Sequence, residues 1–257
     1  MENQELFHLQ NKYKQKEKDS LQEAHIPDDC YLCVRLDGFN STKQYLKDVV
    51  INQVYTKCLS DAHFKVFRAF RHHLNKQFTS SIVCSYMAND EISIILNKNN
   101  DNYDKRIMKI CTLLCGALSS AMTIQMHTET SEFKFTSFDA RPIILASRKE
   151  IVEYLRSRYL ISKKYAYWKI LRLNEFEGVY EDNIKNNIDN AVKFSNEYGY
   201  NSDALKVIST YKFFLPQKNL KPNYWTIEVD DKSMSIDDLK NSINEYLGYL
   251  HQVPRSA

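Results

Sequence analysis

The stretch "SIVCSYMANDEISIIL", residues 81–96, decides the fold that this sequence predicts. Two apolar runs, 81–87 and 92–96, flank the polar trio Asn89-Asp90-Glu91, and both runs are rich in residues that favour strands. Because only a tight polar connection separates the runs, they are predicted to pair as a β-hairpin. Adjacent carboxylates at the tip of a hairpin whose strands otherwise belong to a hydrophobic core then call for an explanation.

The segments around this hairpin complete an ordered series of strands and helices. Two long segments have apolar residues every three or four positions, which predicts amphipathic helices, and two others are extended runs of strand-forming residues. The order strand, helix, strand, strand, helix, strand is the ferredoxin-like, split βαβ motif, with both helices on one face of an antiparallel sheet. The predicted fold class is α+β, a palm of the polymerase and cyclase type. Its predicted elements are strand 30–36, helix 45–78, strands 81–87 and 92–96, helix 103–122 and the extended segment 133–147.

The rest of the chain is predicted to be mainly helical. Residues 1–25 are highly charged and helical in pattern, and they precede the first strand. No repeat or low-complexity linker divides the chain, so we expect 1–150 to form a palm-like catalytic domain and 151–257 to pack on it as a helical extension. The elements predicted beyond the palm are helices 148–172, 182–197, 202–214 and 235–250, with a late strand at 223–231.

The composition is that of an ordinary soluble chain and excludes several classes of protein. With 257 residues, 43% of them apolar and 26% charged, there is ample material for a core. Only five glycines occur, and neither GxGxxG nor GxxxxGK[ST] is present, which argues against a Gly-rich phosphate loop. No continuous apolar run reaches the roughly 18 residues that span a bilayer. The six cysteines fit free thiols in a reducing compartment, so we expect a cytoplasmic protein with no membrane partner.

The carboxylates at the hairpin tip have a geometric explanation in this topology. The first strand lies beside the hairpin strands, so Asp37, where that strand stops, is predicted to lie next to Asp90 and Glu91. Carboxylates a few ångströms apart repel each other unless a cation lies between them or one takes a proton. These oxygens, with the carbonyl of Gly38, suit Mg²⁺, and two such ions could activate an attacking oxygen and stabilise a leaving pyrophosphate. The alternative is that these are ordinary turn residues.

Four short motifs also occur in the order and spacing of one enzyme family. They are "VRLDG" (34–38), "NDEIS" (89–93), "YDKRIMK" (103–109) and "FDAR" (138–141). The sequence resembles the tRNA(His) guanylyltransferase family, whose pattern runs approximately RxDGxxF, SDEYS or SDEIS, an RxxK helix, and FDxR. The resemblance covers roughly residues 5–175 and includes "YLRSR" (154–158). It implies a polymerase-type palm that adds nucleotides to the 5′ end of RNA in the 3′–5′ direction.

The resemblance implies a role for each matching position. Asp37 and Asp90 would be metal ligands, with the carbonyl of Gly38 as a further oxygen, and Glu91 would complete the catalytic carboxylates. Two Mg²⁺ ions would be the cofactor, and nucleoside triphosphates such as GTP and ATP the substrates. The positions assigned to nucleotide and triphosphate binding are Arg35, Gly38, Phe39, Asn40, Asn89, Arg106, Lys109 and Arg141.

The spacing of one basic pair supports its assignment independently of the resemblance. Arg106 and Lys109 are three residues apart in a predicted helix, and such residues share a helix face. Their side chains could therefore converge on one anion. The alternative is that they form the solvated end of that helix.

The chain departs from the family pattern in four respects. The family usually continues after Asp-Gly with R-G-F or R-x-F, whereas "FNSTKQY" (39–45) follows here, and Asn89 replaces the usual Ser. Behind the "YLRSR" segment, "YLISKKYAYWKIL" (159–171) replaces a polar Q-x-D-x-x-x-N run. The His-Ile-Asn-Asn segment typical of eukaryotic members is absent. Since these elements are implicated in handling nucleotide and tRNA, we expect a divergent member without dedicated tRNA(His) recognition.

Three functions are compatible with these patterns. The first is a metal-dependent nucleotidyltransferase that adds nucleotides to the 5′ end of tRNA or another RNA, in tRNA 5′-end repair or guanylylation. The second keeps the palm but makes a small signalling nucleotide, such as a cyclic oligonucleotide. The third is a degenerate palm retained as an RNA-binding scaffold, against which the intact Asp37, Asp90 and Glu91 argue. The resemblance also implies a homotetramer.

Overall fold

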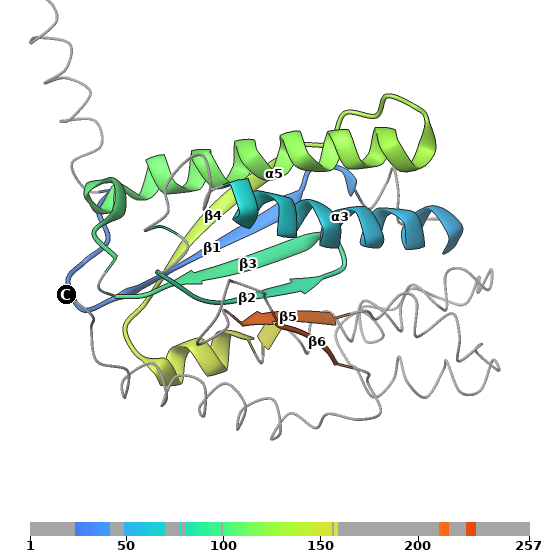
Figure 1. Ribbon diagram of the computed structural model, residues 1–257. Coiled ribbons are helices and arrows are strands. Elements are labelled where there is room, and N and C mark those ends of the chain that lie inside the picture. The colour runs from blue at the N-terminus through green and yellow to red at the C-terminus, as the bar shows by residue number, and fades with distance from the viewer. Residues whose placement is uncertain are drawn as a thin grey trace, which may run out of the picture.

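The order of elements along the chain confirms the predicted α+β motif. In the computed structural model, β1 (Tyr31–Gly38) is followed by α3 (Val49–Ala69), β2 (Ile82–Ala88), β3 (Glu91–Leu96), α5 (Ile107–Thr130) and β4 (Phe138–Leu145) (Figure 1). The structure describes residues 24–41, 49–69, 78, 81–98, 100–155, 157–158, 211–215 and 225–229. The helices predicted at 182–197 and 235–250, and all but the last two residues of the one predicted at 1–25, lie outside these residues.

The strands form one six-stranded sheet with the order β4-β1-β3-β2-β5-β6. Its first four strands have the ferredoxin-like arrangement, in which β1 lies between β4 and β3 and all pairs are antiparallel. The last two strands, β5 (Tyr211–Leu215) and β6 (Trp225–Val229), extend the sheet beyond β2. The late strand expected at 223–231 is therefore present.

One helix prediction in the C-terminal part is wrong at its end, and its residues 202–210 lie outside the described part of the chain. Residues 211–214 were expected to end a helix at 202–214, but they belong to β5 and pair with β2. Without this partner β2 would be an edge strand with a row of unpaired backbone groups, so tertiary pairing outweighs the local pattern. The part of the chain beyond the palm thus contributes strands to the sheet as well as helix.

The hydrophobic core lies between the sheet and two helices. Figure 1 shows α3 and α5 side by side over one face of the sheet, as predicted. Alternate residues of β1, Leu32, Val34 and Leu36, point into this layer, as the period of two in a strand requires. Each fully buried side chain of this kind stabilises the fold by roughly 1.5–3 kcal/mol. The helices meet them with residues three and four apart, chiefly Tyr55, Leu59, Ala62 and Val66 of α3 and Ile107, Ile110, Cys111, Leu114, Leu118 and Met122 of α5.

Helix α5 begins four residues later than its pattern predicts and ends eight residues later. Residues 103–105 have positive φ angles, and Arg106 is extended, with φ −71° and ψ 105°. Residues 24–26, which precede β1, explain why α5 begins so late. The Ile26 N–H donates to the Lys105 carbonyl, and the Ile107 N–H donates to the Ala24 carbonyl. This pairing keeps the α-helix from starting before Ile107.

The same helix is long and apolar enough to span a membrane by length and composition, with a mean hydropathy of 1.7 in its most apolar window. The core helix of a soluble protein passes the same test. Here the buried residues of α5 lie on the stripe that packs against the sheet and α3.

A third helical segment covers the opposite face of the sheet. Residues 148–155 are helical and lie on the side away from α3 and α5 (Figure 1). Ser147 and Glu150 form a cap at its start: the Glu150 N–H donates to Ser147 Oγ, and Glu150 Oε2 accepts from the Ala146 N–H. The domain boundary predicted at residue 150 falls inside this segment. This helical part of the chain brings two side chains to the candidate site.

Candidate active site

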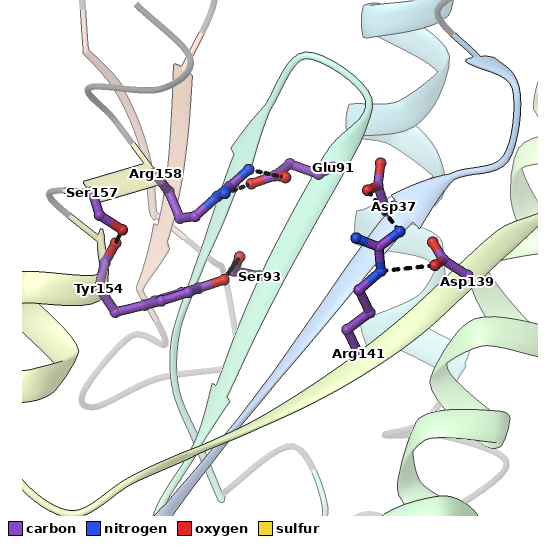
Figure 2. A network of polar contacts seen from close by, with 8 residues as sticks. All are labelled: Asp37, Glu91, Ser93, Asp139, Arg141, Tyr154, Ser157 and Arg158. Atoms are coloured by element: carbon purple, nitrogen blue, oxygen red, sulfur yellow. Dashed lines mark hydrogen bonds and ion pairs between the residues drawn. The ribbon is translucent and has the colours of Figure 1, made fainter. Parts of the chain in front are cut away.

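The candidate site lies at the end of the sheet where β1 stops and the β2–β3 hairpin turns. The strand register makes Asp37 the direct partner of Glu91 on one side and of Asp139 on the other. Directly paired residues share a face of the sheet, so these carboxylates form one row across β4, β1 and β3, on the face opposite α3 and α5 (Figure 2). The structure therefore brings Asp37 and the hairpin tip together, as the topology predicts.

The hairpin turn places Asp90 beside the end of β1. Asn89 has a φ of 56°, a left-handed conformation that Asn adopts more readily than most residues. The N–H of Gly38 donates to the carbonyl oxygen of Asp90 at 3.0 Å. This bond joins the turn to β1, so the backbones of Asp37-Gly38 and Asn89-Asp90 lie next to each other.

Gly38 is required here for space. A Cβ at this position would lie 2.1 Å from Ser41 Oγ and 2.8 Å from the Tyr55 hydroxyl, two atoms that hydrogen-bond to each other at 2.9 Å. Beyond it, Asn40 has a φ of 56°. The backbone N–H of Phe39 donates to the Ser137 carbonyl at 2.8 Å, and its side chain is 64% exposed. An exposed aromatic ring beside the carboxylates is available to stack on a base.

Two of the predicted basic residues lie in the row behind the carboxylates. Arg35 and Arg141 are direct partners in the β1–β4 pair. Arg141 bends toward the carboxylates, with its Nε 2.9 Å from Asp139 and a terminal nitrogen 3.6 Å from Asp37 (Figure 2). The Nε of Arg35 is buried without a hydrogen-bond partner among the described residues. The structure thus places both arginines where they can reach an anion at the site.

Glu91 has a partner that the sequence did not reveal. Arg158, itself helical and three residues beyond the segment 148–155, donates to both carboxylate oxygens of Glu91, with Nε 2.7 Å from Oε1 (Figure 2). The pair is largely buried, since the side chain of Glu91 is 8% exposed and that of Arg158 is 15% exposed. Burial raises the pKa of Glu91, whereas its bonds to Arg158 act in the opposite direction. Arg158 therefore favours the ionised form of this carboxylate most strongly, and the charge of Arg35 acts in the same direction on its pKa.

Tyr154 anchors the same helical segment to the sheet. Its hydroxyl hydrogen-bonds Ser93 Oγ at 2.8 Å, and Ser93 lies two residues along β3 from Glu91, on the same face (Figure 2). It also contacts the buried thiol of Cys33, whose pKa burial raises to about 12. The polar face of the sheet is thus covered by a segment that makes specific contacts with it.

Arg106 and Lys109 lie at the opposite end of the sheet from the carboxylates. Arg106 forms an isolated bridge with His25, which precedes β1, whereas Asp37 is the last but one residue of that strand. The six steps from the start of β1 to Asp37 correspond to roughly 20 Å. The two side chains have local partners: Arg106 pairs with Asp104 at 3.5 Å, and Lys109 lies 5.3 Å from the centre of the Tyr103 ring.

The prediction that this pair shares a face of one helix is wrong. Arg106 has an extended conformation and stands before the first helical residue, so the i, i+3 geometry does not apply. Within one chain, neither side chain reaches an anion held at Asp37.

The donor set at the site suits a hard cation. Asp37 is 30% exposed, and both its side chain and the Gly38 carbonyl offer oxygen atoms next to the Asp90 turn. No cluster of three or more His, Cys, Asp or Glu side chains in metal-binding geometry occurs among the described residues. A bound ion would therefore take two carboxylates and complete its shell with backbone, water or phosphate oxygens, which is the habit of Mg²⁺.

Comparison with known proteins identifies the family. The sequence pattern of the family described as tRNA(His) guanylyltransferase matches residues 10–146, more than half of the chain. The protein belongs to the tRNA(His) guanylyltransferase family. It is thus a nucleotidyltransferase by descent, and the matched region contains every site residue predicted from the sequence. Arg158 and Tyr154 lie beyond it.

Two yeast members of the tRNA(His) guanylyltransferase family are similar to the chain. The enzyme of Schizosaccharomyces pombe is 23% identical over 226 residues, which cover 84% of this chain and 80% of that protein. The enzyme of Candida glabrata is 24% identical over 159 residues, 56% of this chain and 62% of that protein. Identities this low fit a divergent member.

Solved structures of the family share the fold. A bacterial tRNA(His) guanylyltransferase-like protein in complex with ATP has a TM-score of 0.62 and 15% identity, covering 92% of this chain and 97% of that one. The Saccharomyces cerevisiae enzyme has a TM-score of 0.55 and 17% identity, covering 80% and 94%. The chain therefore shares its α+β fold with these solved structures.

Three residues of the site were not predicted from the sequence. Asp139 lies beside the predicted Arg141 in the "FDAR" motif, and the alternation of a strand puts both on one face. That signal was present in the sequence. Tyr154 and Arg158 lie in the "YLRSR" segment, but nothing in a helical pattern specifies which sheet residue such side chains meet.

Proposed function

We propose that the protein is a metal-dependent nucleotidyltransferase that adds nucleotides to the 5′ end of tRNA or another RNA in the 3′–5′ direction. The observation that carries this proposal is the juxtaposition of Asp37 with the Asp90-Glu91 hairpin at the end of a family-type palm. The yeast relatives are tRNA(His) guanylyltransferases, which supports tRNA as the acceptor. The bacterial neighbours in complex with ATP and with GTP support nucleoside triphosphates as donors.

Asp37 and Asp90, with the carbonyl of Gly38, are the residues we propose to hold two Mg²⁺ ions. Such ions supply Lewis-acid chemistry: they lower the pKa of an attacking hydroxyl and offset charge on a departing pyrophosphate. Glu91 does not share this task, because Arg158 occupies both of its oxygens. Its role is to support the turn that carries Asp90.

The basic and turn residues around the carboxylates would bind the nucleotide. Arg141 is 55% exposed and can rotate from Asp139 onto a triphosphate, to which its planar guanidinium can donate two hydrogen bonds. Arg35 adds positive charge behind it. Phe39, Asn40 and Asn89 line the end of the sheet, where Phe39 replaces the basic residue usual in the family.

We also propose that the protein works as a homotetramer in the cytoplasm. All six cysteines are free thiols, as a reducing compartment favours. Exposed apolar side chains near the site end of α5, Ile124, Phe133 and Phe135, are the kind of surface that contact between subunits would cover.

The test is to incubate the protein with Mg²⁺ and each labelled nucleoside triphosphate, with and without 5′-truncated tRNA, beside Asp90→Ala. We expect RNA lengthened at its 5′ end by the wild type and not by the variant. Small nucleotide products formed without RNA would instead indicate a synthase of signalling nucleotides. RNA binding that persists without Mg²⁺ and without any turnover would indicate a scaffold.

A further inference from the structure

The buried ion pair between Arg158 and Glu91 lies next to the turn that carries a proposed metal ligand. Glu91 is the first residue of β3 and follows Asp90 directly. The guanidinium donates to both oxygens of this carboxylate, which fixes the rotation of the carboxylate as well as its position. The direction of the side chain at the start of β3 is therefore set by a residue 67 positions away in sequence.

Arg158 is itself held in place by the segment that bears it. The Tyr154 hydroxyl hydrogen-bonds Ser93 on β3, and Ser157 Oγ donates to the Tyr154 carbonyl at 2.7 Å. At the other end, Ser147 and Glu150 cap the helical residues. The guanidinium thus belongs to an element that is attached to β3 through Tyr154 and is capped at its start, and it can fix the position of the hairpin.

We propose that Arg158 is a positioning residue for the nucleotidyl transfer reaction, acting through Glu91 on the Asn89-Asp90 turn. The inference rests on the proposed function. By occupying both oxygens of Glu91, Arg158 keeps that carboxylate out of the cation site, which leaves Asp37 and Asp90 for the metal. By fixing the first residue of β3, it also fixes the turn whose carbonyl accepts the Gly38 N–H.

This role is separable from a purely structural one because of how buried pairs behave. Removing one partner leaves an uncompensated buried charge, whereas replacing both by apolar residues of similar size is often neutral for stability. A residue that only stabilises the fold should therefore regain its function when both charges are removed. A positioning residue should not, since the carboxylate it orients is then gone.

The experiment compares Arg158→Met, Arg158→Lys and the double variant Glu91→Leu/Arg158→Met with wild type. Arg148→Met is the matched control, because Arg148 belongs to the same helical segment and makes no ion pair among the described residues. Thermal unfolding and steady-state kinetics are measured with saturating Mg²⁺. We expect Arg158→Met to lower both the unfolding temperature and kcat, the latter by about 10- to 100-fold.

The double variant should recover the unfolding temperature of wild type while its kcat stays low. Arg158→Lys keeps the charge but loses the bidentate hydrogen bond to Glu91. It should unfold near the wild-type temperature, with a reduced kcat and a nearly unchanged KM for the nucleotide. Recovery of kcat together with stability in the double variant, or a wild-type kcat in Arg158→Met, would overturn the proposal.

A second measurement does not depend on activity. Amide hydrogen exchange over residues 88–92 is followed in metal-free protein without nucleotide. It should be faster in Arg158→Met and in the double variant than in wild type and Arg148→Met, with little change in α5. If wild type proves inactive but this difference is found, the proposed function fails and the positioning of the turn stands. Equal exchange in all variants would overturn the positioning role whatever the activity.

Discussion

Asp37 and Asp139 lie directly opposite each other in the β1–β4 pair, and the guanidinium of Arg141 reaches both carboxylates. Like charges directly opposite in a sheet destabilise it, so in the absence of a metal ion Arg141 offsets their repulsion. Both carboxylates and Arg141 remain partly exposed, so this bridge can open. In the function that we propose, a cation would take the place of Arg141 beside Asp37, and the guanidinium would then be available to bind the triphosphate.

Replacing Arg141 by Gln should therefore affect substrate binding and metal-free stability together. We expect KM for the nucleoside triphosphate to rise about tenfold, the effect of one lost charge-assisted hydrogen bond. Without Mg²⁺ the midpoint of urea unfolding should fall, and adding Asp139→Asn in the same chain should restore it. A wild-type KM in Arg141→Gln would show that Arg141 does not contact the triphosphate.

Gly38→Ala should destabilise the fold and abolish activity. The added Cβ would overlap Ser41 Oγ and crowd the Tyr55 hydroxyl, and overpacking of this kind costs about 1–3 kcal/mol. Chemical denaturation should report the loss, and adding Ser41→Gly should reverse most of it. Gly116→Ala is the matched control: nothing lies within 4 Å of its Cβ, and Ala should stabilise this helical position by about 0.5–1 kcal/mol.

The buried histidine of α3 should make stability fall in acid. Burial lowers the pKa of His63 to about 3, while the ordinary value in an unfolded chain is about 6.5. Because the folded pKa is the lower one, the unfolded chain binds the proton first, and the stability from neutral His63 is complete above about pH 6.5 and is lost as pH falls toward 3. The full effect is about 5 kcal/mol as an order of magnitude.

Urea unfolding of His63→Gln at a series of pH values tests this assignment. The readout is the slope of the free energy of unfolding against pH between pH 6.5 and 4. The variant should be less stable at pH 7, having lost the bond to Ser85, but its stability should vary less with pH. His127→Gln is the control, since His127 is exposed at the end of α5 and its replacement leaves His63 in place. An unchanged slope in His63→Gln would show that His63 is not the group responsible.

Mg²⁺ should stabilise the folded protein through Asp37. A ligand present at about 100 times its Kd stabilises the state that binds it by about 2.7 kcal/mol. We expect a rise in Tm on adding Mg²⁺ to wild type, and none in Asp37→Asn. Asp104→Asn, which removes an exposed acid at the other end of the sheet, should respond like wild type. A Mg²⁺-dependent rise that persists in Asp37→Asn would place the ion elsewhere.

The local patterns of the palm were sufficient to predict its architecture. Alternating and three-or-four-residue spacings of apolar residues gave the right type for each element from β1 to β4. The boundaries failed where a distant segment intervened: α5 starts at Ile107 because residues 24–26 pair with the chain before it, and 211–215 form a strand because β2 needs a partner. Neither interaction leaves a trace in the local sequence.

The sequence by itself determined that Asp37 and the Asp90-Glu91 turn lie close together. The strand order places the end of β1 beside the tip of the hairpin, and this does not depend on the side chains at the site. Only the tertiary structure decided what each charge is paired with. Arg106 and Lys109 match the family motif yet lie at the far end of the sheet, since α5 begins where β1 begins. Arg158 comes to Glu91 because a segment 67 residues along the chain crosses the polar face, where a buried carboxylate requires a partner.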